Sequence, residues 1–230
     1  MRIIAGKWRG RRLQTPVGRS TRPTGDRARE SLFSSLHSRV GSFEELRVLD
    51  AFAGSGALGF EALSRGAAFL LAIESNPKAV QLVEDNFEML AAGGKPSAQS
   101  PRNDARLGNV AAQPFSSYGD CCGDYDDIFR LYRGDIFKVA PRLAGMAFDL
   151  GFFDPPYDMP ASKLRELLDA LRLLKTFSLG AIIVIERAKT KEPEDLLPEG
   201  YALLATKSIG DSSLTFASFN PEVGTRATLV

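Results

Sequence analysis

Residues 46–65 of the chain read LRVLDAFAGSGALGFEALSR. An apolar run leads directly into a glycine-rich turn, and a helical pattern begins at once behind that turn. Glycines in such a turn allow positive φ and let a ligand approach the backbone, and the helix N-terminus offers unpaired N–H groups. The segment therefore predicts a buried strand over 46–52, a helix over 56–65 and a ligand site at the turn between them.

The rest of the chain continues this alternation of strands and helices. We expect strands at 69–74, 128–133, 147–153 and 180–186, helices at 77–92, 136–143 and 161–175, and a terminal hairpin of 201–209 and 213–219 around Gly210-Asp211. Strands that alternate with helices favour a parallel sheet covered on both faces. The hairpin would add an antiparallel strand at one edge.

Two regions depart from the alternation. Residues 93–127 are rich in Gly, Ser, Asn, Asp and Pro and lack an apolar period, which predicts a mobile insertion. Residues 1–40 carry ten Lys or Arg against two acids, a net charge of +8, so the remainder carries −7. We expect 1–40 to form a basic arm or helix and 41–220 to form the main α/β domain.

The basic segment predicts a polyanionic partner. Nine of its ten cations are arginines, whose guanidinium groups bind phosphate bidentately and stack on bases. A solubilising N-terminus is the alternative. The candidate RNA-binding residues are Lys7, Arg9, Arg11, Arg12, Arg22, Arg27 and Arg29.

Composition excludes several classes of protein. No apolar run approaches the roughly 20 residues that span a bilayer, and the start MRIIAGKWRG does not read as a secretory signal. The two cysteines, Cys121 and Cys122, are adjacent, which favours a reducing, cytoplasmic setting. His37 is the one histidine, so neither a metal site nor a Ser–His–Asp triad is expected.

The glycine turn has two functional interpretations. Its G-x-G-x-x-G spacing from Gly54 to Gly59 also fits a nicotinamide dehydrogenase. Asp50, four residues before Gly54, would repel a pyrophosphate but attract the ammonium and sulfonium of S-adenosylmethionine. Glu74, at the end of the next strand, can accept hydrogen bonds from both ribose hydroxyls of an adenosine. Asp50 therefore favours a methyl donor as the ligand of the turn. A purely structural glycine turn is a third option.

Residues 154–157, Asp-Pro-Pro-Tyr, follow the predicted strand 147–153. Two prolines end the strand and fix an extended chain, which aims Asp154 and the Pro155 carbonyl at the ligand edge of the sheet. Both could accept hydrogen bonds from an exocyclic base amine while the base stacks on Tyr157. Asp154, Pro155, Pro156 and Tyr157 are therefore the candidate catalytic residues, and Asp149 is expected to be a strand-edge acid.

With these motifs the chain resembles the RsmD-like family, the 16S rRNA guanine-N2 methyltransferases of bacteria. The resemblance rests on RIIAGKWRGR at 2–11, RPTGDRARESLF at 22–33, VLDAFAGSGALGFEALSRGA at 48–67, DPPY, and Ile185-Glu186. Three features depart from the family: the length of 93–127, Gly25 where Thr is frequent, and Ile209 where Tyr is frequent.

The resemblance implies a Rossmann-like class I S-adenosylmethionine-dependent methyltransferase with a seven-stranded, mostly parallel sheet. It implies that Asp50 and Gly54 line the methionine part of the cofactor, Glu74 the ribose and Asp135 the adenine ring. Phe52 and Ser55 would form walls of the same site, and Gly56 is a further cofactor-binding candidate in the glycine turn. The implied target is guanine 966 of 16S rRNA, in the small ribosomal subunit or an assembly intermediate, for a cytoplasmic protein that we expect to be a monomer.

Other functions stay open at this point. A DNA adenine-N6 or cytosine-N4 methyltransferase uses a similar tetrad but usually carries a separate target-recognition segment. A non-catalytic nucleic-acid-binding protein on a methyltransferase fold and a dehydrogenase are the alternatives of other classes. Intact Asp50, Glu74 and DPPY argue against a degenerate site.

Overall fold

The computed structural model describes residues 1–15, 24–92, 127–190 and 195–222 of the 230-residue chain. Nearly all of the predicted insertion 93–127, both cysteines and Arg22 lie outside these ranges. Within them, no helix is both long and apolar enough to cross a membrane.

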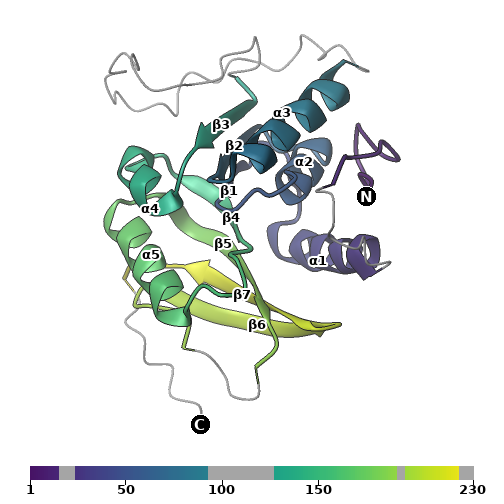
Figure 1. The fold of residues 1–230 in the computed structure, drawn as a ribbon. Coiled ribbons are helices and arrows are strands. Elements are labelled where there is room, and N and C mark those ends of the chain that lie inside the picture. Colours follow the sequence, from purple (N-terminus) through teal and green to yellow (C-terminus); the bar gives the residue numbers. More distant parts are fainter. Residues whose placement is uncertain (16–23, 93–126, 191–194, 223–230) are drawn as a thin grey trace.

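One seven-stranded sheet forms the centre of the molecule, in the order β3-β2-β1-β4-β5-β7-β6 (Figure 1). The strands are β1 (Arg47–Asp50), β2 (Phe69–Glu74), β3 (Phe129–Arg133), β4 (Phe148–Phe153), β5 (Phe177–Ala188), β6 (Tyr201–Ile209) and β7 (Ser212–Phe219). β1 to β5 pair in parallel, whereas β7 is antiparallel to both β5 and β6. The predicted Rossmann-like fold class is confirmed. The terminal hairpin adds two strands, and its second strand, β7, is the one that pairs with β5.

Helices cover both faces of the sheet, as the alternation predicts (Figure 1). The helices are α1 (Thr24–Val40), α2 (Ala57–Ser64) and α3 (Pro77–Ala91) on one face, and α4 (Ile136–Val139), the 3-10 turn η1 (Ala140–Leu143) and α5 (Ala161–Leu173) on the other. Each face has its own buried apolar cluster. The strand residues alternate between the two clusters, with Leu70 in one and Leu71 in the other, because successive side chains of a strand point to opposite faces.

The N-terminal segment packs onto the first of these clusters. Ile3, Trp8 and Leu13 are buried together with residues of α1, α2 and α3. Polar groups hold the segment as well, since the Glu61 carboxylate of α2 accepts hydrogen bonds from the N–H groups of Ile4 at 2.7 Å and Ala5 at 3.1 Å. The described part of 1–40 therefore shares the core of the α/β sheet.

Candidate active site

A cleft of about 1920 Å³ opens at the carboxyl edge of the sheet. Parallel strands end at the same edge, and in open α/β sheets this is the edge at which ligands bind. The lining includes nearly all of the predicted site residues: Asp50, Phe52, Gly54, Ser55, Glu74, Asp135, Asp154, Pro155, Pro156 and Tyr157. The fold thus brings the glycine turn and the DPPY strand end into one cavity.

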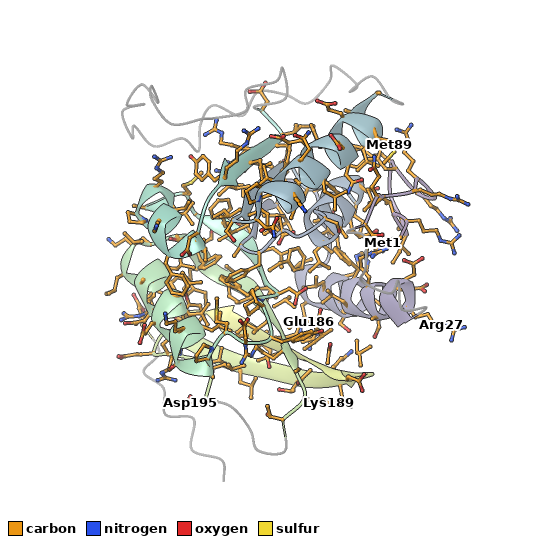
Figure 2. All side chains as sticks on the ribbon, viewed as in Figure 1. Met1, Arg27, Met89, Glu186, Lys189 and Asp195 are labelled. Atoms are coloured by element: carbon orange, nitrogen blue, oxygen red, sulfur yellow. The ribbon has the colours of Figure 1, made fainter. Side chains whose placement is uncertain are left out.

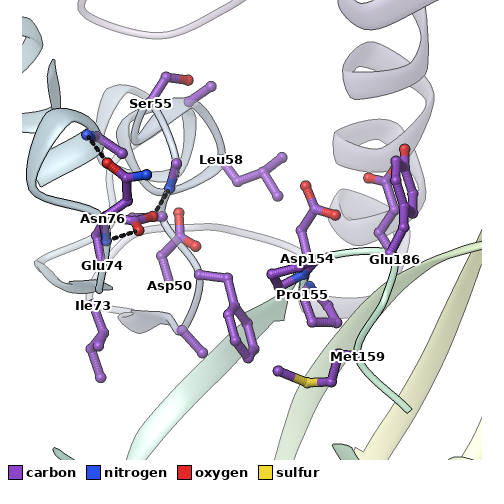
Figure 3. A pocket seen from close by; sticks show the side chains of 18 of the residues that line it. Asp50, Ser55, Leu58, Ile73, Glu74, Asn76, Asp154, Pro155, Met159 and Glu186 are labelled. Carbon is purple, nitrogen blue, oxygen red and sulfur yellow. Dashed lines mark hydrogen bonds between the residues drawn. The ribbon is translucent and has the colours of Figure 1, made fainter. Parts of the chain in front are cut away.

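The glycine turn fixes the acid at the end of β2. The N–H of Gly54 donates to Oε2 of Glu74 at 2.8 Å, and the N–H of Asn76 donates to Oε1 at 2.7 Å (Figure 3). Gly54 has a φ of 59°, and a Cβ there would meet no atom within 4 Å. The turn therefore orients a carboxylate and leaves open space beside its own backbone.

Sequence reasoning missed the contribution of Asn76. Its side chain caps α3 by accepting hydrogen bonds from the N–H groups of Lys78 at 2.9 Å and Ala79 at 3.4 Å, while its own N–H holds Glu74. An Asn before a Pro at the start of a helix is a recognisable N-cap pattern. That pattern in Asn76-Pro77 could have identified the residue.

Gly56, which the sequence analysis names as a cofactor-binding candidate, is not among the residues that line the cleft. It has a φ of 76° and precedes the first residue of α2. A Cβ at this position would lie 2.3 Å from Cε2 of Phe60. Gly56 therefore lets the chain turn tightly into α2 and lie close to the Phe60 ring.

Asp50 ends β1 and is only 2% exposed. Its Oδ2 accepts a hydrogen bond from the N–H of Gly59 at 3.1 Å. Burial and, to a smaller extent, the negative charge of Glu74 together raise the pKa of this carboxyl to about 7, against the lowering effect of hydrogen bonds from the N–H groups of Gly59 and Phe52. A cation in the cleft would favour the ionised form of Asp50.

The DPPY residues leave β4 directly after Phe153. Pro155 is buried, whereas Tyr157, which lines the cleft, is 63% exposed. The N–H of Met159 donates to the Pro156 carbonyl at 3.0 Å and closes the turn. Figure 3 shows the side chains of Asp50 and Asp154 in the same space between neighbouring strand ends. Asp154 thus faces the pocket that Gly54 and Glu74 also line.

The three remaining candidates for the cofactor site surround this centre. Asp135 caps α4, with Oδ1 accepting the N–H of Phe137 at 3.0 Å, and reaches the cleft from the end of β3. Phe52 packs edge-on against Phe153, with ring centroids 6.5 Å apart. The Ser55 carbonyl accepts a hydrogen bond from Asn86 of α3 at 3.0 Å.

Of the candidate RNA-binding cations in the described part of the chain, four are exposed, whereas Arg11 and Arg29 are not. Lys7, Arg9, Arg12 and Arg27 are exposed, with Nζ of Lys7 lying 4.4 Å from the centre of the Trp8 ring. Figure 2 shows Arg27 directed outward from α1. Arg11 is half-buried, and its Nη1 donates to the Leu90 carbonyl at 2.6 Å, near the C-terminus of α3.

Arg29 contradicts its predicted role as a surface contact. Its side chain is only 4% exposed and pairs with Asp26 at 3.0 Å, while its Nε lies 3.9 Å from the buried Glu61 carboxylate. It also donates to the Arg2 carbonyl. The guanidinium therefore links α1 to α2 and to the N-terminal segment, and burial leaves it little surface for an RNA phosphate.

Comparisons with known proteins agree with this fold. Residues 1–115 and 122–218 match the model of the family described as "Conserved hypothetical protein 95". The Ribosomal RNA small subunit methyltransferase D of Haemophilus influenzae is 31% identical over 91% of this chain and 89% of its own length. The protein of the same name from Buchnera aphidicola is 39% identical over 89% of this chain and 86% of its own length.

Among solved structures, a putative methyltransferase of Escherichia coli, yhhF, superposes with a TM-score of 0.68 at 28% identity, over 96% of this chain and 99% of its own. The match of the family model to most of the chain, together with these full-length similarities, shows that the chain belongs to the RsmD-like methyltransferase family.

Proposed function

We propose that this protein transfers a methyl group from S-adenosylmethionine to the exocyclic N2 amine of a guanine in 16S rRNA. The resemblance to its family favours guanine 966 as the target. The observation that carries the proposal is that the Asp154–Tyr157 strand end and the Asp50–Gly54–Glu74 constellation line one cleft. The relatives named as ribosomal RNA small subunit methyltransferases support the choice of RNA.

The residues of the cleft fit the proposed cofactor. The open space beside Gly54 admits a ligand close to the backbone, and the fixed carboxylate of Glu74 has lone pairs left for ribose hydroxyls. The buried Asp50 carboxyl would gain from an adjacent ammonium or sulfonium, which offsets its desolvation. S-adenosylmethionine, when bound, supplies an electrophilic methyl group on a positively charged sulfur.

The DPPY residues would prepare the amine for attack. The lone pair of a base amine is delocalised into the ring, so the nitrogen is a weak nucleophile. Hydrogen bonds from its two N–H groups to the Asp154 carboxylate and the Pro155 carbonyl favour a pyramidal nitrogen whose lone pair faces the methyl carbon. Pro156 fixes the backbone, and the exposed Tyr157 ring offers a face on which the base stacks.

A methyl donor held by Asp50, Gly54 and Glu74 would supply the methyl carbon that bonds to the amine nitrogen, and its sulfur would leave as a neutral thioether. The methylated nitrogen then carries a positive charge and is strongly acidic, so it releases a proton to the Asp154 carboxylate or to water. Asp154 need not deprotonate the neutral amine, which an ordinary carboxylate with a pKa of about 3.9 could not do. The catalytic contribution of the chain is positioning and electrostatic stabilisation.

The exposed cations of the N-terminal segment and α1 would hold the RNA. Lys7, Arg9, Arg12 and Arg27 are free to reach phosphates because their side chains are exposed. Arg22, which lies outside the described residues, is proposed for the same role on the resemblance alone. We further propose that the protein works as a monomer in the cytoplasm, on the small ribosomal subunit or an assembly intermediate.

The substitution Asp154→Asn tests the proposal. It keeps the size of the side chain but removes the charge, so we expect methyl transfer to fall at least about 100-fold while affinity for S-adenosylmethionine changes less than about threefold. Single-turnover transfer of labelled methyl and calorimetric titration measure the two quantities. Asp149→Asn is a matched control, because Asp149 accepts the Arg47 N–H at 3.0 Å at the opposite end of β4. Near wild-type transfer by Asp154→Asn would refute the mechanism.

A further inference from the structure

Glu186 of β5 lies beside the DPPY strand end. The parallel register pairs Phe153 of β4 with Ile185 of β5, so one step along both strands brings Asp154 and Glu186 next to each other. Neighbouring strands are about 4.8 Å apart. Glu186 lines the same cleft as Asp154, and Figure 3 shows the two side chains together.

The orientation of Glu186 follows from the alternation of β5. Val184, two residues earlier on the same face, packs in the cluster that contains Leu32 and Phe33 of α1. Glu186 therefore projects on the α1 side of the sheet, just beyond the apolar core. Its side chain is half-buried and borders the space above Asp154.

The Glu186 carboxylate has no hydrogen-bond or ion-pair partner within the part of the chain that the structure describes. A half-buried carboxylate can only accept hydrogen bonds, and leaving it without a donor is unfavourable. Other acids of the cleft are already engaged, as Asp26 pairs with Arg29, Glu74 accepts two backbone N–H groups and Asp135 caps α4. Asp158 also has no hydrogen-bond or ion-pair partner among the described residues. It is exposed in the turn after Tyr157, however, and does not lie at a strand end.

We propose that Glu186 selects guanine by accepting the N1–H of the base whose N2 amine meets Asp154. This inference rests on the proposed function. The edge of guanine carries two adjacent donors, N1–H and N2–H, which match two adjacent carboxylates. Adenine and cytosine present a ring nitrogen lone pair next to their amines, and that lone pair would face the Glu186 carboxylate. Glu186 is thus a specificity-determining residue, distinct from the DPPY residues that act on the amine.

The base analogue 2-aminopurine isolates this contact. It keeps the exocyclic 2-amino group of guanine but has a lone pair in place of N1–H. A hydrogen bond to a charged group contributes roughly 10- to 150-fold in an equilibrium, so we expect the wild-type protein to prefer guanine over 2-aminopurine about 100-fold in kcat/KM. In Glu186→Gln the side-chain amide can donate to the N1 lone pair, so we expect that preference to shrink at least about tenfold.

The experiment uses small ribosomal particles reconstituted from 16S rRNA that carries guanine or 2-aminopurine at the methylated position. Wild type, Glu186→Gln and the control Glu166→Gln, which changes an exposed glutamate of α5 outside the cleft, are compared by methyl transfer, thermal melting and S-adenosylmethionine affinity. We expect the guanine preference to change only in Glu186→Gln, with melting and cofactor affinity unchanged.

The outcomes separate this inference from the function on which it rests. If wild type methylates guanine and Glu186→Gln keeps the same preference, whether its rate is unchanged or lower on both bases, the selection of guanine by Glu186 is refuted and the proposed function stands. If wild type methylates no guanine in these particles, the proposed function fails and this inference with it.

Discussion

The buried carboxyl of Asp50 ties ligand binding to pH at the scale of a single residue. Its pKa of about 7 means that, without a ligand, the group is largely protonated below that pH. A bound cation favours the ionised form, so binding below pH 7 must expel a proton. Proton release of this kind makes affinity depend on pH.

We therefore expect the affinity for S-adenosylmethionine to fall up to about tenfold for each pH unit below 7, and to level off above it. Asp50→Asn, which cannot ionise, should bind more weakly at pH 8 and should lack this dependence. Titrations at pH 6, 7 and 8 measure both effects, with Asp149→Asn as the control. The same slope in Asp50→Asn and wild type would assign the pH dependence to another group.

The positions of site residues could be predicted from the sequence where they depend on a local motif. Asp50, Glu74 and Asp154 each follow an apolar strand, so their shared position at one sheet edge could be predicted. The roles of Arg29 and Arg11 could not be predicted, because a count of charged residues does not show which side chains are buried. Their partners, Glu61 and the Leu90 carbonyl, are distant in sequence and come close only in the fold.

At the scale of elements, Glu61 joins α2 to the N-terminal segment and α1. Its side chain is fully buried, and besides the N–H groups of Ile4 and Ala5 it binds Nε of Arg65 at 2.8 Å. Removing one partner from a buried ionic network leaves uncompensated charge and donors. The N-terminal segment therefore depends on a residue of α2 for its attachment.

We expect Glu61→Ala to destabilise the protein by about 3–5 kcal/mol and to loosen the N-terminal segment. Trp8, the one tryptophan of the sequence, is 6% exposed in that segment, so its fluorescence should shift to the red. Thermal melting and fluorescence provide the two readouts, with the exposed Glu88→Ala of α3 as control. An unchanged melting temperature in Glu61→Ala would show that the buried network adds no stability.

The elements themselves were largely predictable, because their apolar periods are strong. β2, for example, covers Phe69–Glu74, the range expected from the sequence. The packing of the N-terminal segment could not be predicted, since its buried residues Ile3, Trp8 and Leu13 have neither strand nor helix spacing. The pairing of β7 with β5 also escaped prediction, because a hairpin pattern does not reveal which of its strands faces the sheet.

At the scale of the whole molecule, the exposed Arg9, Arg12 and Arg27 belong to the N-terminal segment and α1, and Figure 2 shows Arg27 directed outward from α1. We expect the triple substitution Arg9→Ala, Arg12→Ala, Arg27→Ala to weaken RNA binding and to reduce the slope of log K against log salt by about 2, at roughly 0.7 per phosphate contact on single strands.

RNA binding of the triple variant and of wild type is measured from about 50 to about 300 mM salt, the range in which counterion release is resolved. A control triple substitution removes Lys138, Arg142 and Lys175, which are exposed on or next to the elements of the other face. Equal slopes for wild type and the Arg9/Arg12/Arg27 variant would exclude these arginines as phosphate contacts.

We propose that two strand-end constellations in one cleft methylate a guanine amine. To test this, the protein is incubated with labelled S-adenosylmethionine and small ribosomal subunits that lack their methyl groups, and the modified nucleotide is mapped by mass spectrometry. We expect one N2-methylguanine in 16S rRNA with the wild-type protein and none with Asp154→Asn. Label on an adenine, a cytosine or a ring nitrogen, or no label on RNA at all, would contradict it.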